Sequence, residues 1–251
     1  SGLLGSNLAI RLCKKYKVSI LVNKKKISIP KTLSIDGDLF FKNSYDEFKP
    51  DLIINTVALT NIELCEKDPI SALEINLNYV KSLISLCNQR KCKLLHISTD
   101  HLSNGSKPFR KENDILEPLN EYARTKLEAD NYIQDRMPTS IIIRTNFFGW
   151  GTSYRNSFSD RIIFETTQRR KLFLFENAFF SPVSIRRLCE ILIKLYEKNA
   201  SGIYNVSSND RISKFNFGLN ICNNFKLDKK LIIPSSIEDN RCLVNRPKDT
   251  S

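Results

Sequence analysis

The 251-residue sequence lacks the long apolar runs, metal-ligand clusters and paired cysteines that mark several large classes of protein. No stretch approaches the roughly 18 to 20 consecutive apolar residues that a membrane span requires, so we expect no membrane partner. There are only two histidines, His96 and His101, and no Cys-x-x-Cys spacing, so we predict no bound metal. The seven cysteines are scattered and odd in number, which indicates reduced thiols and a cytoplasmic protein.

Acidic residues are few relative to basic ones, since 39 Lys and Arg stand against 27 Asp and Glu, for a net charge of +12. Such an excess is compatible with nucleic-acid binding. The lysines, however, are spread along the whole chain, and no interleaved basic and aromatic residues mark a nucleic-acid surface. We therefore predict solvated basic faces and no nucleic-acid partner. A positive field would also attract an anionic small substrate.

Apolar strands and amphipathic helices alternate from the start of the chain to about residue 145. Leu73, Leu77, Val80, Ile84 and Cys87 recur at helical spacing. Strands are predicted over residues 17–22, 33–35, 51–57, 94–99 and 139–144. Near-continuous apolar strands separated by helices indicate an α/β fold with a doubly wound parallel sheet covered on both faces, of the Rossmann type.

The pattern changes after residue 150, where loops are longer and richer in aromatic residues. Helices are predicted over 158–167, 185–196 and 213–224, and strands over 171–175 and 202–206. We predict that residues 1–150 form the Rossmann domain. Residues 151–251 are predicted to form mainly a smaller substrate-binding lobe, with some elements returning to the sheet.

Three residues form a candidate catalytic group. Tyr122 and Lys126 are four residues apart in a predicted helix and so share one face, and Thr99 ends the preceding strand. An ammonium beside a phenol would lower the pKa of Tyr122, which could then exchange a proton with a carbonyl or alcohol oxygen. The Thr99 hydroxyl would hydrogen-bond that same oxygen. Tyr-x-x-x-Lys is common, and an ordinary helix with a half-buried Tyr and a solvated Lys is the alternative explanation.

Several separated motifs occur together in one known family. They are Gly2-Leu3-Leu4-Gly5, residues 51–60 with the downstream Asn76, Ser98-Thr99-Asp100, Tyr122 with Lys126, residues 144–149 and residues 246–251. With them the sequence resembles the extended short-chain dehydrogenase/reductases, and within these the dTDP-4-dehydrorhamnose reductase family. The resemblance covers nearly the whole chain. It implies that residues 1–150 bind NAD(P).

The resemblance also implies a reaction, in which a reduced nicotinamide reduces the C4 keto group of a nucleotide-linked 4-keto-6-deoxy sugar. Tyr122 would protonate the new alkoxide, Thr99 would orient the keto oxygen, and Lys126 would hold the nicotinamide ribose and lower the pKa of Tyr122. Positioned proton transfer of this kind is worth on the order of 10² to 10⁴ in rate. The substrate-binding positions are Thr99, Asp100, Phe147 and Asn156.

The same resemblance implies where the cofactor lies. Residues 2–4 would bring backbone N–H groups to its pyrophosphate at a helix N-terminus. No acidic residue stands about 20 positions beyond the glycines, where one would take the ribose 2′-hydroxyl of NAD. Lysines stand there instead, so we predict NADP(H), with NAD(H) as the alternative. The cofactor-binding positions are Gly2, Leu3, Leu4, Asn23, Lys24, Asp36, Gly37, Ala58, Leu59, Thr60, Ile97, Tyr122 and Lys126.

Both ends of the sequence depart from the family pattern. The chain begins at the glycine turn and stops shortly after Arg246, so we expect it to lack the first strand of the sheet and a closing C-terminal element. Some relatives bridge a dimer through a metal-bound glutamate, at a position that is Asn7 here. We therefore expect neither a bound metal nor the metal-bridged dimer. A homodimer of another kind is still possible.

Three other functions are alternatives. An epimerase of the same superfamily would also use Thr99, Tyr122 and Lys126. A dehydratase is disfavoured, because His101 stands where such enzymes carry the second acid of an Asp-Glu pair. A non-catalytic NADP-binding regulatory subunit is the third, although this chain keeps the Tyr and the Lys. His96 lies inside a strand, which predicts a core histidine with satisfied hydrogen bonds and no catalytic role.

Overall fold

The computed structural model describes residues 2–22, 29–36, 48–152, 156–239 and 244–251. The cofactor predictions for Asn23, Lys24, Gly37 and the side chain of Asp36 lie outside the described residues. None of the described helices is both long enough and apolar enough to cross a bilayer.

A four-stranded parallel sheet forms the centre of the molecule. Its strands are β3 (Leu52–Asn55), β4 (Lys93–Ile97), β5 (Ile141–Thr145) and β10 (Gly202–Val206), in the spatial order β10-β5-β4-β3. All five residues of β5 are buried, as expected of a strand covered on both faces. The parallel α/β sheet predicted from the sequence is confirmed.

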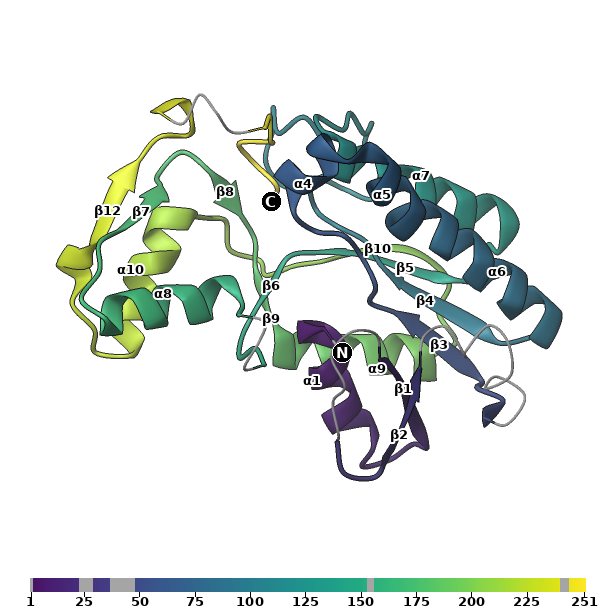
Figure 1. The fold of residues 1–251 in the computed structure, drawn as a ribbon. Helices are drawn as coiled ribbons and strands as arrows, with labels where there is room; N and C mark the ends of the chain where they lie inside the picture. Colours follow the sequence, from purple (N-terminus) through teal and green to yellow (C-terminus); the bar gives the residue numbers. More distant parts are fainter. Residues whose placement is uncertain (1, 23–28, 37–47, 153–155, 240–243) are drawn as a thin grey trace.

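Helices cover both faces of this sheet (Figure 1). On one face lie α4 (Ile62–Lys67), α5 (Pro69–Leu73), α6 (Tyr79–Arg90) and α7 (Glu121–Arg136), and on the other lie α1 (Leu3–Leu12) and α9 (Ile185–Glu197). Each face has its own apolar core, one centred on α6 and α7 and the other on α1 and α9. A separate parallel pair, β1 (Val18–Val22) with β2 (Thr32–Asp36), packs beside α1.

The predicted continuous helix through residues 73–87 is interrupted. A π-helical turn, η2 (Glu74–Asn78), joins α5 to α6 and carries the fully buried Asn76. Such turns occur often at functional sites, because the widened turn redirects side chains. The apolar spacing predicted the helix but not its irregular turn.

The remaining elements form a smaller lobe, on the left of Figure 1. It contains α8 (Phe158–Thr167), α10 (Lys214–Asn224) and the parallel pair β7 (Leu172–Phe175) and β12 (Ile232–Ser235). Two further pairs, β8 (Phe179–Phe180) with β11 (Ile212–Ser213) and β6 (Phe147–Phe148) with β9 (Val183–Ser184), adjoin them. Four aromatic rings pack together in this lobe, those of Phe148, Phe158, Phe180 and Phe217.

The last residues of the chain join the two parts. The Phe179 amide donates to the Lys248 carbonyl at 2.7 Å, and the Arg110 amide donates to the Ser251 carbonyl at 3.0 Å. Gly105 has φ +73°, and a Cβ there would lie 2.7 Å from the Lys248 nitrogen. This loop after β4 therefore requires a glycine to lie against the C-terminal segment.

Candidate active site

The candidate catalytic residues meet at the carboxyl end of β4. Thr99 lies two residues beyond the strand, and Tyr122 and Lys126 lie on the first two turns of α7. Asn120 caps α7, because its side chain accepts a hydrogen bond from the Ala123 amide at 2.9 Å. The cap fixes where the helix begins and hence which side chains face the strand end.

Thr99 and Tyr122 are brought together and shielded from solvent. Thr99 is 4% exposed and Tyr122 9% exposed. Hydrogen bonding to Thr99 lowers the pKa of Tyr122, but burial has the larger effect and raises that pKa overall. The His101 ring stands edge-on to the Tyr122 ring, with centroids 6.3 Å apart. The prediction that Lys126 lowers the pKa of Tyr122 is therefore wrong for this structure.

Lys126 instead points to the strand. Its Nζ donates to the Ile97 carbonyl oxygen at 2.8 Å and lies 2.9 Å from His96 Nε2. The residue is 1% exposed, and burial lowers the pKa of Lys126 to about 8, against an opposing effect of Asp130. The expectation that His96 is a satisfied core histidine is confirmed, since its Nδ1 lies 3.0 Å from Asn55 Nδ2. The sequence did not reveal that its other nitrogen contacts Lys126.

The N-terminus of α1 fits the pyrophosphate of a dinucleotide. Gly2 is the N-cap, no side chain caps the helix, and its first turn contains no acidic residue. A Cβ on Gly2 would meet nothing within 4 Å among the described residues, so there is free space beside this glycine. A Cβ on Gly5 would lie 3.0 Å from Thr56 Oγ1, so this glycine allows α1 to approach the end of β3 closely.

Asn76 holds the loop that carries Ala58, Leu59 and Thr60. Its Oδ1 accepts from the Leu59 amide at 2.8 Å, and its Nδ2 donates to the Leu59 carbonyl at 3.2 Å and to Thr125 Oγ1 at 3.1 Å. One buried side chain thus ties the predicted cofactor loop to α7. Asn76 was named as part of the family motif, but no role was predicted for it.

Two side chains near Tyr122 carry unpaired polar atoms. Asp100 Oδ2 and His101 Nδ1 are buried and have no hydrogen-bond partner in the described part of the chain. Burial and the nearby cations Lys214 and Arg246 lower the pKa of His101, while Asp100 opposes them. Burial lowers the pKa of Lys214 to about 8. Sequence reasoning missed both cations, which reach this site from the smaller lobe and from the C-terminal segment.

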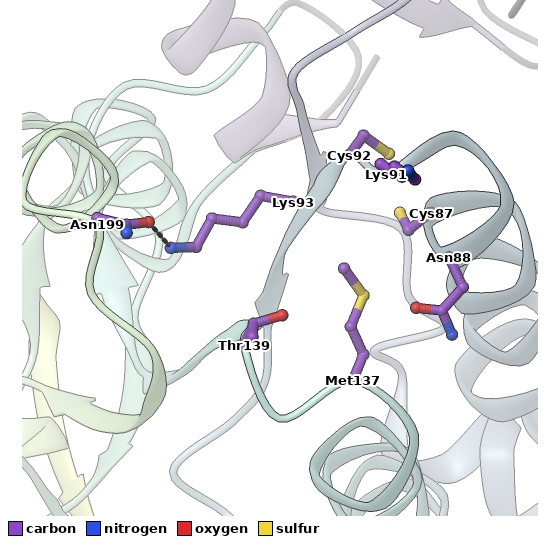
Figure 2. A pocket seen from close by; sticks show the side chains of 8 residues that line it. All are labelled: Cys87, Asn88, Lys91, Cys92, Lys93, Met137, Thr139 and Asn199. Atoms are coloured by element: carbon purple, nitrogen blue, oxygen red, sulfur yellow. Dashed lines mark hydrogen bonds between the residues drawn. The ribbon is translucent and has the colours of Figure 1, made fainter.

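Two cavities lie away from the candidate catalytic residues. One of about 330 Å³ is at the amino end of β4, beside Cys87, Cys92, Met137 and the Lys93–Asn199 hydrogen bond (Figure 2). The other, of about 420 Å³, is on the smaller lobe beside Trp150. Neither is lined by Thr99, Tyr122 or Lys126.

The sequence matches the family described as the RmlD substrate binding domain over residues 1–251. The chain belongs to this family. A dTDP-4-dehydrorhamnose reductase of Aggregatibacter actinomycetemcomitans is 30% identical over 184 residues, which cover 70% of this chain and 62% of that protein. The chain thus matches less than two thirds of the length of this curated relative.

Solved structures are similar over nearly the whole chain. A hypothetical dTDP-4-dehydrorhamnose reductase of Sulfolobus tokodaii has a TM-score of 0.85 at 28% identity, covering 100% of this chain and 88% of that one. A dTDP-4-dehydrorhamnose reductase of Bacillus anthracis, in complex with NADP, has a TM-score of 0.86 at 23% identity, covering 99% and 86%. The predicted resemblance to extended short-chain dehydrogenase/reductases is confirmed.

The other two predicted substrate-binding residues, Phe147 and Asn156, lie in different surroundings. Phe147, on β6, is half-buried and packs against the core of the α1 and α9 face. Asn156 is exposed and lines the separate cavity beside Trp150, and no contact in the described residues joins it to Thr99 or Tyr122. The structure therefore gathers Thr99, Asp100, Tyr122 and Lys126 but not Asn156.

Proposed function

We propose that the protein is an NADPH-dependent reductase of the C4 keto group of a nucleotide-linked 4-keto-6-deoxy sugar. One observation carries the proposal: the buried hydroxyls of Thr99 and Tyr122 lie beside two unpaired polar atoms, Asp100 Oδ2 and His101 Nδ1. Buried polar groups normally have partners, so these atoms are suited to a polar ligand. A sugar offers the hydroxyl and carbonyl groups that would pair with them.

The nicotinamide, when bound, supplies the hydride. Tyr122 donates its phenolic proton to the oxygen that gains charge at C4, and Thr99 hydrogen-bonds the same oxygen. Because its pKa is raised, Tyr122 is fully protonated at neutral pH, which is the form an acid needs. Lys126 would hold the nicotinamide ribose by donating a hydrogen bond to it.

Different residues would hold the cofactor and the nucleotide of the substrate. Residues 2–4 would bind the cofactor pyrophosphate through backbone N–H groups, and residues 58–60 would line the cofactor site. Lys214 and Arg246 bind the diphosphate of the sugar nucleotide by charge-assisted hydrogen bonds. Phe147 lines the sugar site. Asn156, which lies in the separate cavity, has the weakest support.

We also propose which part of the chain binds the cofactor and which part binds the substrate. Residues 1–150 bind the cofactor and residues 151–251 mainly bind the substrate, although β10 (Gly202–Val206) belongs to the central sheet. NADP(H) is the proposed cofactor, as in the Bacillus anthracis structure, and NAD(H) the alternative. We propose a cytoplasmic enzyme without a membrane or nucleic-acid partner, and leave a homodimer open.

The test follows the absorbance of NADPH, and separately of NADH, on addition of a freshly prepared dTDP-4-keto-6-deoxy sugar to the purified protein. We expect oxidation of NADPH that requires the sugar nucleotide and is faster than that of NADH. If the protein binds NADP(H) but oxidises neither cofactor, the proposal is wrong. Interconversion of sugar epimers without net oxidation would then identify the epimerase alternative.

A further inference from the structure

Asn120 does more than cap helix α7. Its Oδ1 accepts a hydrogen bond from the Ala123 amide at 2.9 Å, and its Nδ2 donates to the Asn245 carbonyl at 2.8 Å. Asn120 is only 6% exposed. One buried side chain therefore joins the start of α7 to the C-terminal segment, residues 244–251.

The two hydrogen bonds of Asn120 require the same orientation of its amide. The Ala123 N–H needs an acceptor, and the Asn245 carbonyl needs a donor, so a reversed amide would lose both. Aspartate also caps helices well, but its carboxylate has no hydrogen to donate. The link to Asn245 is therefore a property of the amide that capping alone does not require.

The C-terminal segment is attached on both sides of Asn245. Before it, Val244 packs against the buried apolar cluster that contains Tyr122. After it, Arg246 pairs with Glu63 of α4, and the backbone further on hydrogen-bonds to the smaller lobe at Phe179. The segment thus lies between the surroundings of Tyr122 and the smaller lobe.

Two groups of the proposed machinery stand next to the Asn120–Asn245 contact. Tyr122 is two residues after Asn120, and Arg246 directly follows Asn245. The charge of Arg246 acts on His101, whose ring stands edge-on to the Tyr122 ring. One hydrogen bond and two short pieces of backbone therefore connect the acid to a cation of the same site.

The proposed substrate requires a fixed distance between such groups. Its diphosphate is attached to sugar C1 and its keto group is at C4, on opposite sides of a six-membered ring. The separation of the two groups can vary little, so an acid placed for C4 must be aligned with the cation that binds the diphosphate. Alignment of this kind is a large part of catalysis, and small misplacements are costly.

We infer that Asn120 is a positioning residue that sets the distance between Tyr122 and Arg246, an inference that rests on the proposed reductase function. Its Oδ1 fixes the first turn of α7, which carries Tyr122. Its Nδ2 fixes the segment that carries Arg246. Asn120 itself transfers no proton and acts through these two residues.

The variant that separates the two roles is Asn120→Asp. The carboxylate keeps the cap and is favourable at a helix N-terminus, but it loses the donor and faces the Asn245 carbonyl oxygen. Asn61→Asp is the matched control, because Asn61 caps α4 through the Leu64 amide at 2.8 Å. In the described part of the chain no hydrogen bond joins the Asn61 side chain to residues 244–251. Both variants should melt close to the temperature of the unmodified protein.

The first readout is amide hydrogen exchange followed by NMR, which needs no activity. The Thr250 amide donates to the Phe179 carbonyl at 3.0 Å and reports on the segment. Loss of one hydrogen bond that holds the segment should make this amide exchange about threefold to tenfold faster in Asn120→Asp. The Ala123 amide should keep its protection, because the cap remains. Asn61→Asp should change neither amide.

The second readout is the effect of Arg246→Met on steady-state kinetics in two backgrounds. In the unmodified protein it should raise KM for the sugar nucleotide about tenfold or more. Asn120→Asp alone should lower kcat/KM on the order of 10 to 10²-fold, with the Kd for NADPH unchanged. In the Asn120→Asp background, Arg246→Met should have a much smaller effect, because Arg246 is already misplaced. A merely structural role of Asn120 would give additive losses.

Three results would overturn the inference. The first is a Thr250 amide that exchanges equally fast in Asn120→Asp and in the unmodified protein. The second is a loss of protection at Ala123 as large as that at Thr250, which would mean that capping alone is affected. The third is a full effect of Arg246→Met in the Asn120→Asp background. An unmodified protein without reductase activity would contradict the proposed function, and the exchange data would then decide whether Asn120 joins the segment to α7.

Discussion

The two ends of strand β4 (Lys93–Ile97) present opposite kinds of surroundings. At its amino end a cavity of about 330 Å³ is bounded by sulfur-containing side chains, and none of its eight lining residues has a buried side-chain polar atom without a partner. At its carboxyl end Asp100 and His101 bury polar atoms that have no hydrogen-bond partner in the described part of the chain. Unpaired polar atoms occur elsewhere as well, as at Ser140 Oγ and Ser235 Oγ. It is their position near Thr99 and Tyr122 that favours a ligand site at the carboxyl end.

This difference follows from the fold. The carboxyl ends of the strands in a parallel sheet receive the loops and helix N-termini that bind ligands. At the amino end the loops close the core, and Lys93 pairs with Asn199 at 2.8 Å. We therefore expect substitutions at the carboxyl end to change activity and those at the amino end to change stability.

The largest effect is expected for Tyr122→Phe. Removal of the acid should lower kcat on the order of 10² to 10⁴-fold while the protein stays folded. Tyr132→Phe, on the same helix α7, is the matched control and should retain nearly full activity. The measurement is steady-state NADPH oxidation with saturating sugar nucleotide. Equal losses in the two variants would contradict the assignment of Tyr122.

The second effect concerns the cation that reaches the site from the smaller lobe. Lys214→Met should raise KM for the sugar nucleotide about tenfold or more, because a charge-assisted contact to a phosphate is lost. The pKa of Lys214 is about 8, so in the unmodified protein KM should rise above pH 8 as the side chain loses its charge. The exposed Lys230→Met is the control. A KM that is independent of pH between 7 and 9 would refute the role.

At the amino end, Met137→Ala should act on stability. Met137 is 8% exposed and lies in the core of the α6 and α7 face, so truncation should lower the free energy of unfolding by about 2 to 5 kcal/mol. At a temperature where the variant is folded, kcat should equal that of the unmodified protein. Urea unfolding and the NADPH assay measure the two quantities. A large loss of kcat in folded protein would mean that the amino end takes part in catalysis.

The smallest effect is expected for Lys93→Met. Its hydrogen bond to Asn199 is solvent-exposed, so the free energy of unfolding should change by no more than about 1 kcal/mol and kcat should not change. The same urea and NADPH measurements apply. A change of several kcal/mol would show that the contact in Figure 2 has a larger structural role.

The sequence predicted the parts of the structure that depend on local pattern. Apolar runs predicted strands β4 and β5, because both faces of these strands are buried. Helical spacing predicted α6, because this helix buries one face. The pairing of Thr99 with Tyr122 followed from their positions at a strand end and a helix start. These features need only the chain order and the direction of a parallel sheet.

The remaining features depend on contacts between distant segments, which local pattern does not record. Lys126 was expected to contact the cofactor and lower the pKa of Tyr122, but its nearest partners are His96 and the Ile97 carbonyl. Lys214 is more than 110 residues from Asp100 in sequence, yet its charge acts on that site. The π-helical turn at Asn76 lies inside a regular apolar pattern, so its spacing predicted an ordinary helix.

The measurement that tests the central claim most directly is the fate of the transferred hydrogen. NADPH carrying deuterium at both hydrogen positions of nicotinamide C4 would be incubated with the protein and a dTDP-4-keto-6-deoxy sugar, and the product examined by mass spectrometry and NMR. We predict one deuterium at sugar C4, transferred at a rate that falls on the order of 10² to 10⁴-fold in Tyr122→Phe. A product without deuterium at C4, formed by protein that binds the cofactor, would contradict the account.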